Sequence, residues 1–132
     1  MTIKKCIVEM TFSKTKEELE MDRRQLGKIG EDMAAEILRC KGYRILERNY
    51  RCRAGEIDII ADRYGELCFV EVKTRQGFNY GRPCEAVSYE KKKHIRSTAQ
   101  QYLEELREQG IFPRRVDYQV IEVVVEHHVN AF

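Results

Sequence analysis

Residues 55–75 read GEIDIIADRYGELCFVEVKTR, in which two runs rich in Ile, Val and Phe flank a short polar turn. Runs of this composition are typical of β-strands, and the turn between them predicts an antiparallel β-hairpin. Successive side chains of a strand point to opposite faces of a sheet, and both faces of the second run are largely apolar. A strand that is apolar on both faces is normally buried between packed layers. The stretch therefore predicts the centre of a layered sheet.

Charged side chains interrupt both runs. Asp58, Glu71 and Lys73 fall where the apolar pattern predicts burial, and an unpaired charge is destabilising there. If Tyr64-Gly65 is a two-residue loop, counting back along both strands pairs Asp58 with Glu71 on one face. A three-residue loop would shift the register by one and send the two carboxylates to opposite faces. In the first register two acids and one lysine converge. A divalent cation bound by the carboxylate oxygens is the simplest way to compensate the repulsion between the two negative charges.

Composition and length limit the class of protein. A chain of 132 residues is expected to form a single domain, over residues 21–132, after an N-terminal extension of residues 1–20 without a predicted element. The net charge is only +2, so total charge neither demands nor excludes a nucleic-acid partner. Five widely spaced cysteines, none at zinc-site separation, are expected to be reduced thiols. No signal peptide or membrane span is predicted, so the expected location is the cytoplasm.

Apolar periodicity predicts the remaining elements. Helices are expected over residues 22–41 and 88–108, where apolar residues recur at helical spacing. Strands are expected over residues 43–50 and 116–125. Together with the hairpin, these elements predict an α/β fold with a three-layer core, in which helices flank a mixed central sheet of about four to five strands.

One acid of the first helix is a further candidate for the site. Glu31 lies at the flank of the apolar stripe, and its helical neighbours Gly27, Ala34 and Ala35 are small. Its carboxylate can therefore reach an adjacent strand. The other interpretation is that Glu31 is a surface residue, and helical spacing alone does not decide between the two.

A basic segment follows the hairpin and continues into the first half of the second helix. A run of charges on a helix is often only a solvated face, but these charges share one sign and follow a loop rich in glycine and aromatic residues. That arrangement favours contact with phosphates. The predicted nucleic-acid-binding residues are Arg75, Arg82, Lys91, Lys92, Lys93 and Arg96.

The charged residues of the hairpin suit phosphodiester hydrolysis. Clustered carboxylates that hold Mg²⁺ support this reaction, because the cation neutralises developing charge and lowers the pKa of bound water. A lysine beside the metal can orient the attacking water and balance the phosphate charge. The Glu-x-Lys spacing places Glu71 and Lys73 side by side on one strand face, and Asp58 lies on the paired strand.

Four segments resemble a known bacterial family: Gly30-Glu31, GEIDIIA over residues 55–61, FVEVKTR over residues 69–75, and the terminal residues 130–132. They are similar to the YraN-like family, uncharacterised proteins expected to be endonucleases. That family resembles the PD-(D/E)XK restriction-endonuclease-like superfamily, which includes archaeal Holliday-junction resolvases. The resemblance covers the chain from about residue 24 onward. One departure is Ile57, which stands where the superfamily's name has proline, a substitution common among its relatives.

The resemblance implies an enzyme that hydrolyses DNA with a metal cofactor, branched or structured DNA being one candidate substrate. It implies that Asp58 and Glu71 bind the metal, with the backbone carbonyl of Val72 as a further ligand. By the same resemblance Lys73 is the catalytic lysine, and Glu31 assists metal or water binding. The implied metal is Mg²⁺, with Mn²⁺ as a substitute. A homodimer would suit a two-stranded substrate.

Two other functions remain open from the sequence. The first is a nucleic-acid-binding module of the same fold without catalysis, which would bind DNA in a salt-sensitive way and leave it intact. The second is a structural or protein-interaction domain, in which Lys73 only neutralises Asp58 and Glu71. That domain would bind no metal.

Overall fold

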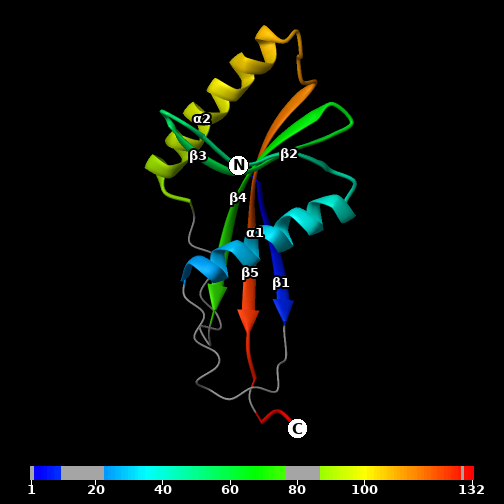
Figure 1. Cartoon of the computed structure of the whole chain (residues 1–132), viewed down its shortest axis with the longest axis vertical. Helices are drawn as coiled ribbons and strands as arrows, with labels where there is room; N and C mark the ends of the chain where they lie inside the picture. The colour runs from blue at the N-terminus through cyan, green and yellow to red at the C-terminus, as the bar shows by residue number, and fades with distance from the viewer. Residues whose placement is uncertain (1, 10–22, 77–86, 129) are drawn as a thin grey trace.

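The strands and helices follow the order expected for the hairpin and its flanking helices, with one additional strand at the N-terminus (Figure 1). The computed structural model describes the backbone of residues 2–9 and, with side chains, residues 23–76, 87–128 and 130–132. In chain order the elements are β1 (Thr2–Glu9), α1 (Arg23–Cys40), β2 (Arg44–Cys52), β3 (Gly55–Arg63), β4 (Glu66–Gln76), α2 (Tyr89–Glu108) and β5 (Arg115–Glu126).

The strands of the described residues form one mixed sheet in the order β1-β5-β4-β3-β2. β5 is parallel to β1 on one side and to β4 on the other. β3 is antiparallel to both β4 and β2. Parallel neighbours need a crossover connection, and α2 lies in the one between β4 and β5. The mixed sheet with flanking helices confirms the predicted α/β fold class and is consistent with a restriction-endonuclease-like core.

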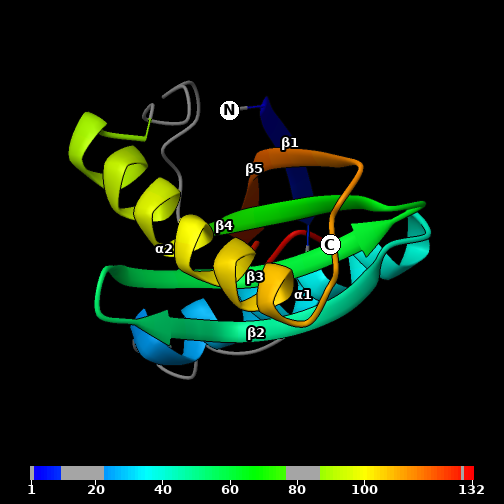
Figure 2. The same ribbon diagram turned by 90° about the horizontal axis from the view of Figure 1, so that it is seen from above.

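The two helices pack on opposite faces of the sheet, which gives two cores (Figure 2). On one face α1 packs on the sheet through Leu26, Ala34, Ala35 and Leu38, against Ile59, Ala61, Cys68, Val70, Ile121, Val123 and Val125. On the other face α2 packs through Ile95, Ala99 and Tyr102, against Ile57, Ile60, Leu67, Phe69 and Val120. The central strands are therefore buried on both faces, as their doubly apolar sequence predicted.

The turn between β3 and β4 is the two-residue loop on which the predicted site depends. Arg63 pairs with Glu66 across it, and the ladder continues to the pair of Ile59 and Val70. Tyr64 and Gly65 both have positive φ, 52° and 77°, as a type I′ hairpin turn requires. The predicted register is therefore confirmed along this ladder. The next position on each strand carries an acid.

The strand β1 was not expected from local periodicity. The extension predicted over residues 1–20 contains this strand, which runs parallel to β5 from the pair of Thr2 and Gln119 to the pair of Glu9 and Glu126. Its pairing partner lies at the opposite end of the chain, so a local pattern does not reveal it. Among the described residues, no helix is both long and apolar enough to cross a membrane.

Candidate metal and nucleic-acid site

Asp58 lies on β3 at the point where the ladder to β4 ends. Its Oδ2 accepts a hydrogen bond from the backbone N–H of Val72, with a donor–acceptor distance of 2.8 Å. Ile57 and Ile60 pack in the same α2-side core, although regular alternation would send them to opposite faces. The strand is therefore irregular at Asp58, and the carboxylate serves as the partner of a neighbouring backbone N–H.

Glu71 of β4 lies beside Asp58, and together we call them the acid pair. The Glu71 side chain is only 12% exposed. Burial raises its pKa to about 7, and the negative charge of Asp58 adds to the rise. Burial also raises the pKa of Asp58, while its hydrogen bond with the Val72 N–H lowers it in part. Each carboxyl group is among the causes of the other's pKa shift, so the two lie close together.

A cation from α2 forms an ion pair with Glu71. Lys91 Nζ lies 3.2 Å from Glu71 Oε1, and its charge lowers the pKa of both acids in part. Ser88 is the N-cap of α2, and its hydroxyl accepts a hydrogen bond from the Lys91 backbone N–H at 3.2 Å. The cap therefore holds Lys91 in the first turn of the helix. A residue predicted to contact phosphate therefore forms an ion pair with one acid of the pair, and its contact with phosphate stays a prediction.

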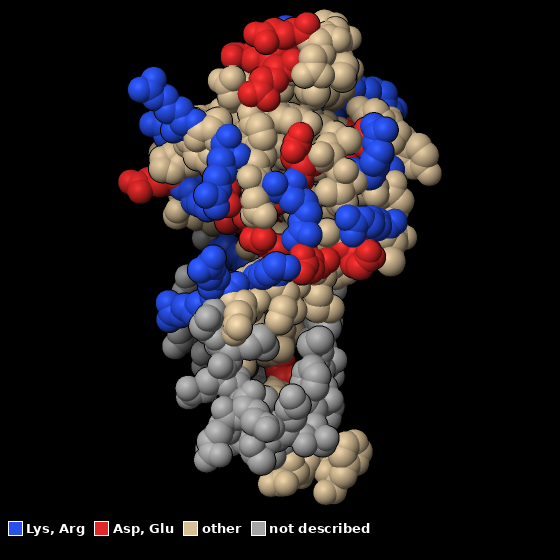
Figure 3. All heavy atoms as spheres, viewed as in Figure 1, with Lys and Arg blue, Asp and Glu red and all other residues tan. Residues whose placement is uncertain are grey.

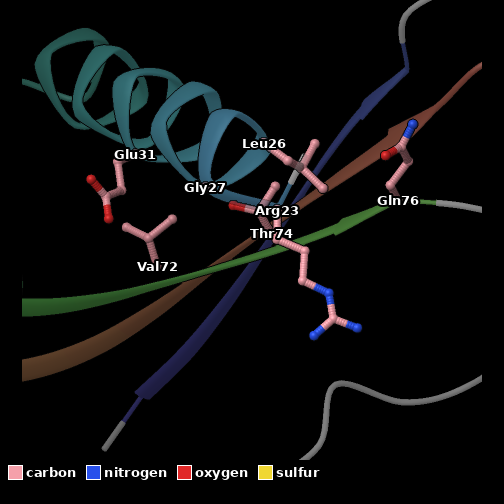
Figure 4. A pocket seen from close by; sticks show the side chains of 7 residues that line it. All are labelled: Arg23, Leu26, Gly27, Glu31, Val72, Thr74 and Gln76. Atoms are coloured by element: carbon pink, nitrogen blue, oxygen red, sulfur yellow. The ribbon is translucent and has the colours of Figure 1, made fainter. Parts of the chain in front are cut away.

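Glu31 approaches the same strands from α1. The preceding residue, Gly30, lies so close to β4 that a Cβ atom there would overlap the Thr74 side chain. This close contact brings the α1 backbone onto the strand, and Figure 4 shows Glu31 facing Val72 across a hollow. The small-residue face predicted from the sequence is thus the face by which α1 meets β4.

The electrostatic environment of Glu31 includes the acid pair. Burial raises the pKa of Glu31, and the charge of Asp58 is the next largest cause of that rise. The nearby charge of Arg48 offsets part of it. Of the two interpretations left open by the sequence, the structure therefore supports the one in which Glu31 reaches the strands.

The chemistry of these donors fits a hard divalent cation. Carboxylates and a backbone carbonyl are the oxygen ligands that Mg²⁺ and Mn²⁺ prefer, and a bound cation would favour the ionised form of Glu71, whose pKa burial raises to about 7. In the described part of the chain, no group of three or more His, Cys, Asp or Glu residues is arranged to hold a metal by itself. The role of Glu31 as a metal ligand stays a prediction, and a cation held by Asp58 and Glu71 would complete its shell with water or substrate oxygen.

Two residues of the β4 motif lie beside a buried acid of β5. Lys73 is half-buried and pairs in register with Glu122. Arg75 forms an ion pair with Glu122, whose side chain is only 1% exposed. The guanidinium of Arg75, predicted to bind nucleic acid, therefore has an internal partner on the neighbouring strand.

The other predicted nucleic-acid-binding residues differ in how they are placed. Lys92 and Lys93 lie in the first turns of α2, where Lys93 is exposed and Lys92 half-buried. Arg96 is exposed and lies near Tyr118. Burial raises the pKa of the Tyr118 phenol, and the nearby charge of Arg96 offsets part of that rise. Arg82 lies outside the described residues.

The comparison with protein families decides the relationship that the sequence motifs suggested. The model of the uncharacterised protein family UPF0102 matches residues 30–123, most of the chain. The chain belongs to the UPF0102 family. The YraN-like resemblance is thereby confirmed at the level of the family, while the superfamily placement stays a prediction. The UPF0102 description names no activity.

Several UPF0102 proteins are similar over most of their length. The protein of Alkaliphilus oremlandii is 46% identical over 116 residues, covering 83% of this chain and 98% of the relative. That of Clostridium novyi is 39% identical over 107 residues, covering 81% of this chain and 87% of the relative. That of Caldanaerobacter subterraneus is 39% identical over 123 residues, covering 86% and 98%.

The part of the chain matched by the UPF0102 model contains Glu31, Asp58, Glu71 and Lys73. The contact of Lys91 with the acid pair was missed from the sequence. An N-cap at Ser88 predicts only that Lys91 lies in the first helical turn. Which strand that turn faces depends on how α2 crosses the sheet, and no local pattern encodes it.

Proposed function

We propose that this protein is a metal-dependent endonuclease that hydrolyses phosphodiester bonds in DNA. The observation that supports the proposal most strongly is the acid pair, two partly buried carboxyl groups on adjacent strands, in which burial raises the pKa of Glu71 to about 7. Buried acids with raised pKa values are typical of functional sites. Branched DNA is a candidate substrate, and a homodimer would place two such sites on a two-stranded substrate.

Each residue of the site has a role in this proposal. Asp58, Glu71 and the Val72 carbonyl would hold Mg²⁺ or Mn²⁺. The bound cation would neutralise developing phosphate charge and lower the pKa of a water molecule. Lys73, two residues after Glu71 on the same strand face, would orient that water and balance the phosphate charge. Glu31 would hold a water at the edge of the site next to α1.

A second candidate is a DNA-binding module without catalysis. The ion pair between Lys91 and Glu71 favours it, because this pair already supplies a cation to the acids. In that case the acid pair and its lysine would be structural, and the exposed cations of α2 would bind phosphates. The two candidates differ in whether DNA is cut and in whether Lys73 matters.

The test is cleavage of labelled linear, flapped and four-way DNA in the presence of Mg²⁺ or Mn²⁺. Wild type should cut at least one of these, and Asp58→Asn, Glu71→Gln and Lys73→Met should each lower the rate about 100-fold or more. Lys41→Met is the matched control, because it removes an exposed lysine that lies outside the proposed site. Intact DNA with wild type, or equal cleavage by Lys73→Met, would sink the nuclease proposal.

Calorimetry with Mn²⁺ separates the remaining alternatives. A nuclease should release heat on binding Mn²⁺, and Glu71→Gln should abolish that heat. A protein that binds DNA with neither cleavage nor Mn²⁺ heat is the silent module. A protein that binds neither DNA nor Mn²⁺ is the structural domain, with the acid pair neutralised internally.

A further inference from the structure

A groove next to the acid pair is lined by residues outside the predicted nucleic-acid-binding group. It consists of two hollows of about 520 and 610 Å³ that share Arg23, Gly27 and Glu31. The first hollow reaches Thr74 of β4 (Figure 4). The second extends to Arg51 of β2. We call the two together the α1 groove, which crosses the first turns of α1 and passes Glu31.

The charged residues that line the α1 groove are four cations and two acids, Glu31 and Glu56. Its cations are Arg23, Arg24 and Lys28 of α1 and Arg51 of β2. Lys28 and Arg51 form ion pairs with Asp32 and Glu56 at partly or fully exposed positions, and such pairs are weak. Within the described part of the chain, Arg23 and Arg24 form no ion pair. Figure 3 shows Lys and Arg atoms over the face that carries α1, with Asp and Glu atoms among them.

The floor of the α1 groove is a glycine that packing does not require. A Cβ atom added at Gly27 would meet no heavy atom within 4 Å, whereas one added at Gly30 would overlap Thr74. Glycine inside a helix lowers helix stability relative to alanine. Among the described residues nothing packs against Gly27, so the groove is open there and a ligand backbone can come close to the helix.

We propose that the α1 groove binds the phosphodiester backbone of the substrate, with one strand crossing the first turns of α1 and passing Glu31 on its way to the acid pair. The proposal deepens the proposed function, since it defines a path for the nucleic acid to the site. Arg23 and Arg24 contact phosphates, and Gly27 gives the backbone room. The basic turns of α2 then contact the substrate from the other face of the sheet.

The charge contribution is tested by fluorescence anisotropy with labelled DNA and RNA of one sequence, single-stranded and duplex, in EDTA to prevent cleavage. The double variant Arg23→Ala, Arg24→Ala should raise the Kd about tenfold or more at low salt. It should lower the slope of log K against log salt by roughly two, about one for each lost phosphate contact. The control is Lys41→Ala, Arg107→Ala, which removes the same charge at the far ends of the two helices.

The outcomes decide the proposal in either direction. A larger loss with the Arg23 and Arg24 variant than with the control supports the α1 groove. Equal losses overturn it, because net charge then accounts for binding, and so does absence of binding by wild type. Tighter binding of RNA than of DNA supports the groove and contradicts the choice of DNA as substrate.

Gly27→Ala tests the open floor without any change of charge. This substitution should raise the Tm, because alanine favours the helix, and should nevertheless weaken DNA binding several-fold. A raised Tm with unchanged binding overturns the proposed path. Failure of the groove is distinct from failure of the nuclease proposal: the first is unchanged binding by these variants, and the second is intact DNA with wild type and Mg²⁺.

Discussion

At the scale of single residues, two effects disfavour the ionised form of Glu71: its burial and the negative charge of Asp58 beside it. Burial and the charge of Asp58 raise the pKa of Glu71 to about 7, and Lys91 offsets only part of the rise. The carboxyl group therefore holds its proton in the folded protein at a pH where it would release it in the unfolded chain. The strand register set by the two-residue loop predicted that Asp58 and Glu71 meet. The register contained no information on Lys91, because this residue reaches the acid pair from α2.

The protonation of Glu71 makes stability depend on pH in a defined direction. Its pKa is about 7 in the folded protein, against a reference value of 4.5. The folded state thus binds more protons between these values, and metal-free stability should fall as pH rises from about 4.5 to 7. Glu71→Gln removes this dependence and should raise the free energy of unfolding at pH 8, by on the order of 1 to 3 kcal/mol, and by much less at pH 5.

Urea unfolding of wild type and Glu71→Gln in EDTA at the two pH values measures the difference. Glu104→Gln, at an exposed position of α2, is the control and should give no gain that grows with pH. A gain for Glu71→Gln that is the same at both pH values would contradict the assigned environment of this carboxyl group.

At the scale of elements, the site depends on how closely α1 approaches β4. The sequence predicted a small-residue face on this helix, and Gly30 is the point where that face contacts Thr74. It also predicted both helices to within one or two residues of their ends. The crossing of α2 over the sheet was not predictable, because it depends on the fit of side chains from several strands.

The two glycines of α1, three residues apart, should respond to alanine with opposite signs. Gly30→Ala should destabilise the protein by about 1 to 3 kcal/mol, because its Cβ overlaps the Thr74 side chain. Gly27→Ala should stabilise it by up to about 1 kcal/mol, because its Cβ meets open space. Chemical unfolding of both variants makes the comparison.

The variant Gly30→Ala combined with Thr74→Ala should recover part of the loss, since the closest contact is with the Thr74 Oγ1. If Gly30→Ala is as stable as wild type, the close contact of α1 with β4 is not maintained in solution.

At the scale of the whole molecule, the sheet joins the two ends of the chain. β5 lies between β1 and β4, so a strand from the first residues pairs with one from the last. The α/β class and the mixed sheet followed from the strand and helix patterns. The position of β1 did not, because it rests on a pairing between residues more than 100 apart in sequence, such as Thr2 with Gln119.

A chain that begins at Met21 tests the contribution of β1. It should still fold, because the described residues after position 22 already form a core on each face of the sheet. Its free energy of unfolding should be lower, since β5 then becomes an edge strand with unpaired backbone groups along eight positions. Urea unfolding gives the loss, and light scattering should detect association through the exposed edge. Equal stability of the two chains would show that β1 contributes nothing to the fold.

The ion pair between Lys91 and Glu71 also bears on whether the protein needs a metal ion in order to fold. Small zinc domains are unfolded until the metal arrives, because their ligands have no other source of compensation. Here a side chain of the protein supplies an internal counter-ion to the acid pair. We therefore expect the fold to assemble without metal, and a cation at the proposed site would have to compete with the Lys91 ammonium group.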